Sequence, residues 1–450
     1  MREVIGNTES LCPVCLTRIP AEKVAENGKI YLEKSCLEHG SFRTLIWRRD
    51  LKHYQDWAEG SGRASGPLRS LTPVDRGCPY DCGLCPEHWT RACTTIIEVT
   101  LRCNLKCPVC FASSDKNVEY EPNIDVIRDI YASVLEGVGV STLQLSGGEP
   151  TVRNDLPQLL ALAREMGFHH ILINTNGIKI ARDRSYLRRL KESGATTIYL
   201  QFDGVSDDVY RLIRGVALFK LKKQAVDNCA QEKIAVVLVP TIVPGVNNHQ
   251  LGAIVQFAKS HMPTVKGIHI QPVTYLGRYP ASPPDEDRIT LPDVIDALES
   301  QTNGELKEQD FLPRHAHDSH CAFSSFFILT REGKLQGISN RTRGRVCSQC
   351  AGITPEESSR RFMRRHWEFQ ESYQPGVEDT LYGRLLNYSL TISCMPFQDA
   401  WSIDLDKLRG CCRQVAIPGR RIIPFCAYYL TSTSGERLYP TPLVGARASK

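Results

Sequence analysis

The stretch IIEVTLRCNLKCPVCFA, residues 96–112, determines how the rest of the chain is interpreted. Its first residues are mostly β-branched and apolar, so the sequence predicts a buried strand over 96–100. A tight loop follows and carries Cys103, Cys107 and Cys110 with the spacing C-x3-C-x2-C. The combination places three thiols directly beyond the end of one strand.

Three thiolates on one loop can hold three irons of a [4Fe–4S] cluster and leave the fourth iron without a protein ligand. An open iron is a place where a small molecule can bind and be reduced. Disulfides would require a fourth partner and an oxidising compartment, and closed zinc sites normally take four protein ligands. The motif therefore predicts an iron–sulfur cluster with one open position.

A C-x3-C-x2-C loop after a first strand resembles the signature of the radical S-adenosylmethionine (SAM) superfamily. The resemblance implies that SAM binds the open iron and is reductively cleaved to methionine and a 5′-deoxyadenosyl radical, which abstracts a hydrogen atom. The residue before the third cysteine is often aromatic in that superfamily. This chain has Val109 there, with Phe111 just after the motif.

The overall composition is that of a globular protein. With 450 residues, 42% hydrophobic and 23% charged, the chain is expected to form two to four domains. The net charge of +5 permits an anionic substrate but does not indicate nucleic acid. The first ten residues lack an apolar export signal, and the longest apolar run, 234–246, is too short to span a bilayer. We expect a cytoplasmic protein, in which eighteen cysteines indicate metal sites rather than disulfides.

The first segment, 1–58, has the cysteine spacing of a zinc-ribbon or rubredoxin-like module. CPVC supplies Cys12 and Cys15, and KSCLEHG supplies Cys36 and His39. The pattern C-x2-C-x20-C-x2-H suits a closed tetrahedral Zn or Fe site. A more distant cysteine could replace the histidine, which would then cap a turn.

A second cysteine-rich segment, 59–94, precedes the predicted strand. Four thiolates in sixteen residues, spaced C-x3-C-x2-C-x7-C, are enough for an auxiliary [4Fe–4S] cluster. The first three repeat the spacing of the loop after the strand, so a second SAM-type cluster is the alternative. The lack of a preceding strand favours the auxiliary cluster. The expected ligands are Cys78, Cys82, Cys85 and Cys93.

Between residues 95 and 280, apolar segments alternate with helical patterns such as 124–136 and 156–166. This alternation predicts an α/β fold with a parallel sheet. Six such units match the partial (β/α)6, TIM-like barrel that the superfamily resemblance implies. Functional residues are then expected just beyond the C-terminal ends of the strands. The predicted strands are 96–100, 142–146, 170–174, 197–202, 235–242 and 267–271.

Several polar residues follow these strand ends. The segment SGGEP, 146–150, resembles the superfamily segment that binds the SAM amino group, and its glycines allow close backbone approach. Asp203 is expected to orient a ribose or substrate hydroxyl, and Arg214 to pair with the SAM carboxylate. The alternatives are that the aspartate caps a helix and that the arginine is solvated. Gln271 and Tyr275 are expected to face the pocket. The expected SAM-binding residues are Ser146, Gly147, Gly148, Glu149, Asn176, Asp203, Arg214 and Thr241.

The alternation ends at a Pro-rich acidic break, 281–287, and residues 281–450 are expected to form a C-terminal domain. Four of its cysteines could converge on a further Fe–S cluster, although the sequence does not determine which four. Scattered buried cysteines can also act as small apolar residues, in particular Cys229 and Cys394. The candidate ligands are Cys321, Cys347, Cys350, Cys411, Cys412 and Cys426.

The order of these motifs resembles the group that contains archaeal tetraether lipid synthase and the class D, methylene-pterin-using radical SAM methyltransferases. The resemblance implies several metal centres and the formation of a C–C bond at an unactivated carbon, by methylation or by coupling of two lipid chains. It implies a small-molecule or lipid substrate, a flavodoxin- or ferredoxin-type electron donor, and a reduced folate or methanopterin one-carbon donor. A peptide-modifying radical SAM maturase and a non-catalytic Fe–S electron carrier are the alternatives.

Overall fold

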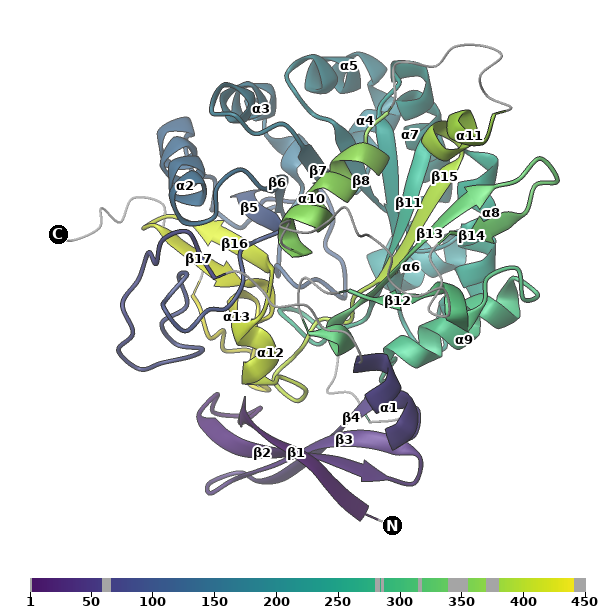
Figure 1. Ribbon diagram of the computed structural model, residues 1–450. Coiled ribbons are helices and arrows are strands. Elements are labelled where there is room, and N and C mark those ends of the chain that lie inside the picture. The colour runs from purple at the N-terminus through teal and green to yellow at the C-terminus, as the bar shows by residue number, and fades with distance from the viewer. Residues whose placement is uncertain are drawn as a thin grey trace.

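The computed structural model describes residues 2–58, 66–279, 284, 287–314, 318–338, 355–369 and 380–440. Figure 1 shows a small antiparallel sheet below a large α/β body. Across the described part of the chain, every helix is too short or too polar to cross a membrane.

The small sheet is the N-terminal module. Its strands pair in sequence order, and the two-residue turn between the second and third is built by Asn27 and Gly28, with φ of 51° and 71°. A short helix follows and is anchored to the body by Trp57, whose Nε1 donates to Ser319 O at 2.9 Å. The elements are β1 (Arg2–Leu11), β2 (Arg18–Glu26), β3 (Lys29–Cys36), β4 (Gly40–Trp47) and α1 (Leu51–Ala58).

The body is built on a parallel sheet, and all six predicted strands are present in it. Strands buried on both faces consist of continuous apolar runs, which explains why the sequence predicted them. The strands are β5 (Thr94–Thr100), β6 (Thr142–Gly147), β7 (Ile171–Thr175), β8 (Thr197–Gln201), β9 (Ala235–Val239), with β10 (Thr241–Ile242) beyond it, and β11 (Val265–Pro272). The helices between them are α2 (Ile124–Gly137), α3 (Leu156–Glu165), α4 (Ile178–Arg182), α5 (Arg184–Glu192), α6 (Asp207–Arg214), α7 (Phe219–Glu232) and α8 (Leu251–Ser260).

Residues after 281 extend this sheet instead of forming the separate domain that the sequence predicted. One parallel strand is added at each edge, β15 beside β11 and β16 beside β5, and antiparallel strands follow outside them. The open edges of the partial barrel, with their backbone hydrogen-bonding groups, are paired in this way. The added elements are α9 (Leu291–Gln301), β12 (Leu312–Pro313), β13 (Phe323–Leu329), β14 (Leu335–Gly337), α10 (Pro355–His366), α11 (Leu381–Asn387), β15 (Ser389–Cys394), α12 (Leu405–Arg409), β16 (Arg413–Ile417), β17 (Arg421–Pro424) and α13 (Phe425–Tyr428).

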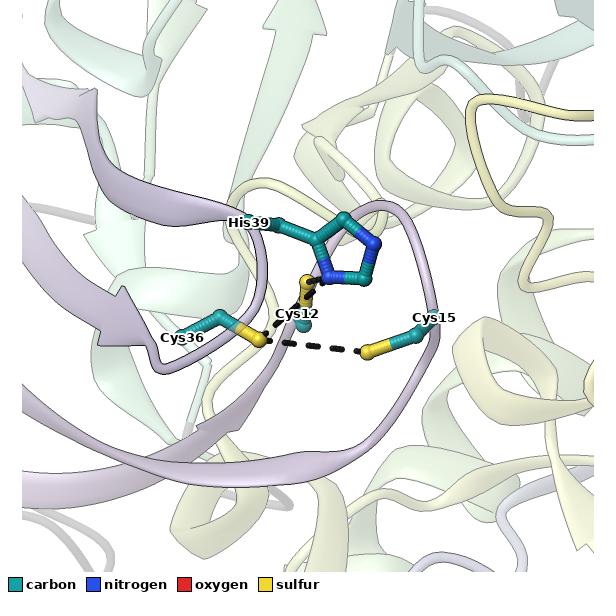
Figure 2. A group of neighbouring side chains, drawn as sticks. All are labelled: Cys12, Cys15, Cys36 and His39. Atoms are coloured by element: carbon teal, nitrogen blue, oxygen red, sulfur yellow. Dashed lines mark hydrogen bonds between the residues drawn. The ribbon is translucent and has the colours of Figure 1, made fainter.

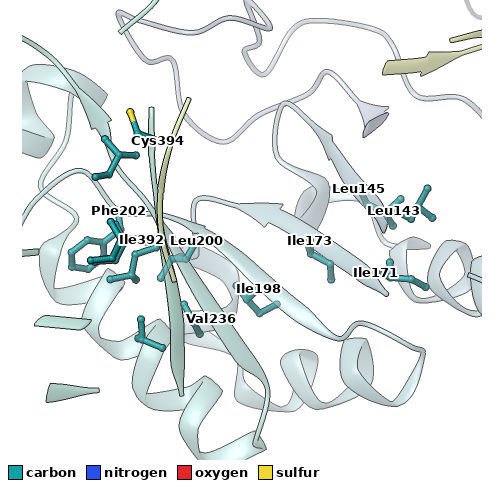
Figure 3. Packing of buried hydrophobic residues seen from close by; sticks show 14 of the residues in the cluster. Leu143, Leu145, Ile171, Ile173, Ile198, Leu200, Phe202, Val236, Ile392 and Cys394 are labelled. Carbon is teal, nitrogen blue, oxygen red and sulfur yellow. The ribbon is translucent and has the colours of Figure 1, made fainter. Parts of the chain in front are cut away.

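Side chains alternate between two environments along each strand. Leu143, Leu145, Ile198 and Leu200 belong to the apolar core, part of which Figure 3 shows. The residues between them face the barrel interior, where Gln144 and other polar side chains line a cavity. The strands therefore bury an apolar outer face, and their inner face carries polar side chains where it lines the cavity.

One end of the barrel is closed by a tryptophan after α10. Trp367 is 4% exposed and packs against Leu172, Tyr199 and Val237. Its Nε1 donates to Thr391 Oγ1 at 2.6 Å. The cavity therefore opens at the other end, where the cysteine loop lies.

Candidate functional site

The N-terminal module brings its four predicted metal ligands together, as Figure 2 shows. Cys12, Cys15, Cys36 and His39 have ligand atoms that all lie within 4.8 Å of one another. The Cys15 and Cys36 sulfurs are 4.0 Å apart, and His39 Nδ1 lies 3.5 Å from Cys36 Sγ. Around a tetrahedral ion with Zn–S bonds of about 2.3 Å, ligand sulfurs are separated by somewhat less than about 4 Å. The hydrogen bond from His39 lowers the pKa of Cys36 to about 6, which favours the thiolate that a metal requires.

The loop with Cys103, Cys107 and Cys110 is held by contacts that the sequence did not reveal. Arg278 donates from Nε to Cys107 O at 2.9 Å, and its backbone exchanges two 2.9 Å hydrogen bonds with Cys110. A side chain at Gly277 would collide with the backbone of Phe111, so this approach requires glycine. The three thiols are partly exposed and line one cavity.

The same cavity receives most of the side chains expected to bind SAM. Val109, at the position that is often aromatic in the superfamily, and Phe111, just after the motif, also line it. Tyr275 does not; it packs against Tyr279 and Trp401 instead. The predicted residues that line the cavity are Ser146, Gly147, Gly148, Glu149, Asn176, Arg214, Thr241 and Gln271.

The glycines of SGGEP press this segment against the cysteine loop. Gly148 N donates to Thr100 O at 2.8 Å, and Glu149 N donates to Arg102 O at 3.0 Å. A side chain at Gly147 would collide with the Thr100 carbonyl. The glycines were expected to let the backbone approach a ligand closely. In the structure they let it pack closely against the residues just before Cys103.

The Glu149 carboxylate is 1% exposed and already accepts several hydrogen bonds. Its Oε1 accepts from the hydroxyls of Thr151 and Thr175, both at 2.6 Å, and its Oε2 accepts from Asn176 N at 2.7 Å. This network fixes the carboxylate at the cavity wall. Its negative charge also contributes, after burial, to raising the pKa of Cys103 to about 12. An iron bound there would have to displace the thiol proton.

Asp203 does not line the cavity, contrary to the expected contact with a ribose or substrate hydroxyl. It is fully buried and holds Arg214, accepting from Nε at 2.7 Å and from Nη2 at 2.8 Å. Arg214 also donates to Thr241 Oγ1 at 3.0 Å. The aspartate is therefore a positioning residue for an arginine that reaches the cavity.

Lys222, like Arg278, is a residue of the site that the sequence analysis did not identify. It is fully buried on α7, and its Nζ donates to Asn176 O at 2.6 Å and to Gln201 Oε1 at 2.7 Å. Burial lowers its pKa to about 7. Only the helical pattern was visible in the sequence, because a lysine on a helix is normally solvated.

The cysteines expected to form one auxiliary set are divided in the structure. Cys82 packs beside Cys78, and the hydrogen bond with Cys78, burial and the charges of Cys78 and Cys85 raise the pKa of Cys82. Cys93 instead contacts Cys412, with 2.8 Å between their sulfurs. The reason is strand pairing, since β16 lies beside β5 and Arg413 is in register with Thr94.

The C-terminal cysteines partly converge. Cys411 is partly exposed, and Cys412 and Cys426 are buried. Desolvation of the Cys411 thiol, together with the charge of Cys426, raises the pKa of Cys411 to about 12. Cys321 lies near the same group, since its charge adds to burial in raising the pKa of Cys426. Cys347 and Cys350 lie outside the described residues. Cys229 and Cys394 belong to the apolar core, as the alternative interpretation expected.

Several known protein families and proteins are similar to this chain. Residues 97–258 match the Radical SAM superfamily model, and residues 4–48 match the HMPTM N-terminal zinc ribbon domain. A 7,8-dihydro-6-hydroxymethylpterin dimethyltransferase of Methanocaldococcus jannaschii is 36% identical, over 94% of this chain and 92% of its own. An Fe-coproporphyrin III synthase of Methanosarcina barkeri is 37% identical over 32% of this chain and 36% of its own. The crystal structure of Streptococcus suis SuiB bound to S-adenosylmethionine is 17% identical, with a TM-score of 0.39, over 47% of each chain.

The cofactors of this family are a [4Fe–4S] cluster and SAM, and the donor set in the cavity suits them. Among the described residues that line the cavity, the three thiols of the loop face the same space as a fixed carboxylate and a fixed guanidinium. The zinc ribbon supplies a further metal site. On this evidence the chain belongs to the radical SAM superfamily.

Proposed function

We propose that this enzyme is a class D-like methyltransferase that forms a C–C bond on a pterin-related small molecule. The observation that carries the proposal is the likeness to the pterin dimethyltransferase, which extends over nearly the whole of both chains. The motif order that suggested this group in the sequence supports it as well. The required partners would be a flavodoxin- or ferredoxin-type electron donor and a reduced folate or methanopterin one-carbon donor.

Cys103, Cys107 and Cys110 would hold the SAM-binding cluster. When bound, the cluster and SAM supply the radical that removes a hydrogen atom from an unactivated carbon, which acid–base groups cannot do. Glu149 would accept from the SAM amino group and Arg214 would pair with its carboxylate. Residues of the surrounding strands would keep the target carbon near the SAM ribose and exclude water.

The cysteines outside the cavity would hold auxiliary clusters. Phe425 and Arg413 line the cavity wall, and each is adjacent in sequence to a cysteine of the C-terminal group, Cys426 and Cys412. A cluster in that group would lie directly behind the wall. This position suits the transfer of an electron to or from the reaction space.

The test is anaerobic incubation of reconstituted enzyme with SAM, dithionite and deuterated 7,8-dihydro-6-hydroxymethylpterin. We expect deuterium in 5′-deoxyadenosine and, with a one-carbon donor present, a pterin enlarged by one or two CH2 units. The triple variant Cys103→Ala, Cys107→Ala, Cys110→Ala should abolish both, whereas the core variant Cys229→Ala should not. SAM cleavage by the triple variant, or deuterium that never leaves the pterin, would contradict the proposal.

A further inference from the structure

A group of buried polar side chains lies inside the barrel, on the side of the cavity away from its mouth. Gln144, Tyr199 and Arg413 line the cavity and are 3–4% exposed, and His269 lies beside them at 1%. Within the part of the chain that the structure describes, five of their polar atoms have no hydrogen-bond partner. These atoms are Gln144 Oε1, Tyr199 Oη, His269 Nε2 and Arg413 Nε and Nη2.

Such atoms are costly unless a ligand satisfies them. A buried polar group without a partner destabilises a fold by about 1–3 kcal/mol, and a charged group by more. Residues elsewhere on the same strands pack into the apolar core, so the fold does not require polarity here. The concentration of unsatisfied atoms on the inner face therefore indicates a binding subsite.

The sheet brings these residues to one place from distant parts of the chain. Arg413 opens β16 in register with Thr94 of β5, and Gln144 on β6 is in register with Ile96. The rings of Tyr199 and His269 are 5.8 Å apart on the opposite wall. Trp367 closes the barrel beneath Tyr199, with 6.2 Å between their rings.

The unsatisfied atoms form a defined pattern of donors and acceptors. The Arg413 Nε and Nη2 groups are parallel donors, which suit two adjacent acceptors on a planar ligand. The Gln144 amide nitrogen donates to Asn174 Oδ1 at 2.7 Å, which leaves its oxygen as an acceptor. Tyr199 can donate or accept. A matching ligand must therefore offer neighbouring acceptors and at least one donor.

We propose that this subsite binds the 2-amino-4-oxo ring of the pterin substrate; the inference rests on the proposed function. The carbonyl oxygen of that ring and N5 of the fused ring lie side by side as two acceptors on one edge of the pterin. Its ring N–H and exocyclic amino group are donors. Arg413 binds the acceptor edge, Gln144 Oε1 accepts from an N–H, and Tyr199 and His269 complete the contacts. A phosphate or carboxylate fits the arginine but offers Gln144 Oε1 no donor when ionised.

This subsite also sets the orientation of the substrate. The cysteine loop and Glu149 occupy the mouth of the cavity, at the strand ends. When Arg413 binds the acceptor edge and Gln144 binds the ring N–H or amino group, the other end of the fused rings, with the 6-substituent, points away from Gln144 and toward the mouth. Substitution of either residue should therefore alter pterin binding more than the assembly of the metal sites.

The test measures pterin binding directly and does not depend on turnover. The probe is 7,8-dihydro-6-hydroxymethylpterin, titrated anaerobically into reconstituted enzyme and followed by its fluorescence. We expect Arg413→Met and Gln144→Leu each to raise the Kd at least tenfold while retaining the wild-type iron content. Arg420→Met and Gln158→Leu, both on exposed side chains, are the matched controls and should leave the Kd unchanged.

Three results would overturn the inference. One is a wild-type enzyme that does not bind the pterin, or variants that bind it with unchanged Kd. Another is loss of iron in Arg413→Met with no change in pterin affinity, which would make Arg413 a counter-charge for a cluster at Cys93 and Cys412. The third is binding of glycerol phosphate, and not of the pterin, in an Arg413-dependent manner. If the wild type binds the pterin through these residues but transfers no deuterium, only the proposed reaction fails.

Discussion

At the scale of single residues, His170 makes the stability of the barrel sensitive to acid. It is 4% exposed, and Thr142 Oγ1 lies 3.2 Å from its Nδ1. Burial, with the nearby charge of Arg364, lowers its pKa to about 3. In the unfolded chain a histidine takes up a proton below about pH 6.5. Between about pH 3 and about pH 6.5 the unfolded state therefore binds more protons than the folded state. As a result, the free energy of unfolding falls as the pH falls through this range.

We expect His170→Asn to remove part of this dependence. Well below pH 6.5, the free energy of unfolding of the wild type should fall by about 1.4 kcal/mol more than that of the variant for each unit by which the pH is lowered. Urea unfolding of both proteins at pH 7 and pH 5 provides the measurement. His249→Asn, on an exposed residue, serves as the control and should follow the wild type. Equal pH dependence in wild type and His170→Asn would show that His170 is not the titrating group.

Asp203 gives a second prediction at this scale. Asp203→Asn would leave the buried Arg214 guanidinium without its carboxylate, and breaking a buried pair costs about 3–5 kcal/mol. Arg214 should then lose its fixed position at the cavity, so the Kd for SAM should rise at least tenfold with iron content retained. Equilibrium dialysis of labelled SAM measures this. Asp208→Asn, on the exposed side of α6, should bind SAM normally, and normal binding by Asp203→Asn would exclude the positioning role.

At the scale of elements, the zinc ribbon is structurally attached to the body but separate from the cavity. Lys34 Nζ donates to Ala400 O at 2.7 Å, and Lys23 pairs with Asp404 at 2.7 Å. Among the described residues that line the cavity, none comes from 2–58. We expect Cys36→Ser to lose about one metal ion per chain and to make β1–β4 sensitive to protease, because such sites stabilise small folds directly.

SAM cleavage should persist in Cys36→Ser. Metal analysis, limited proteolysis and 5′-deoxyadenosine release are measured together, with Ser35→Ala, an exposed neighbour, as the control. Retention of the metal by Cys36→Ser would remove Cys36 from the ligand set. Loss of SAM cleavage would show that the ribbon does contribute to the active site.

The elements also show what could be predicted from sequence. The strands before residue 280 were found because each is a buried apolar run followed by polar residues, a local pattern. The pairing of β16 with β5 is not local, since it joins Thr94 to Arg413. For the same reason the four ligands of the zinc ribbon and the strand-end residues that line the cavity could be predicted, whereas Arg278, Arg413 and the contact of Cys93 with Cys412 could not. Their roles arise only from contacts with distant parts of the chain.

At the scale of the whole molecule, the C-terminal segment completes the reaction space. It supplies one cavity wall through Arg413 and Phe425 and brings Cys412 to Cys93. One group of thiols, on the cysteine loop, lines the cavity, and Cys412 and Cys426 are the sequence neighbours of two residues in its wall. If both groups of thiols hold iron–sulfur clusters, as proposed, a reaction in the cavity can be coupled to electron transfer through the C-terminal cluster.

We expect Cys412→Ser to separate SAM cleavage from product formation. If Cys412 is a ligand, the variant should lose up to about four irons per chain, the content of one [4Fe–4S] cluster. The cluster at Cys103, Cys107 and Cys110 should remain, so SAM should still be cleaved while product formation falls. Iron analysis and the ratio of product to 5′-deoxyadenosine measure the two effects, and the buried core variant Cys229→Ala controls for loss of a buried thiol. Full iron content in Cys412→Ser would show that the contact with Cys93 is packing and not metal binding.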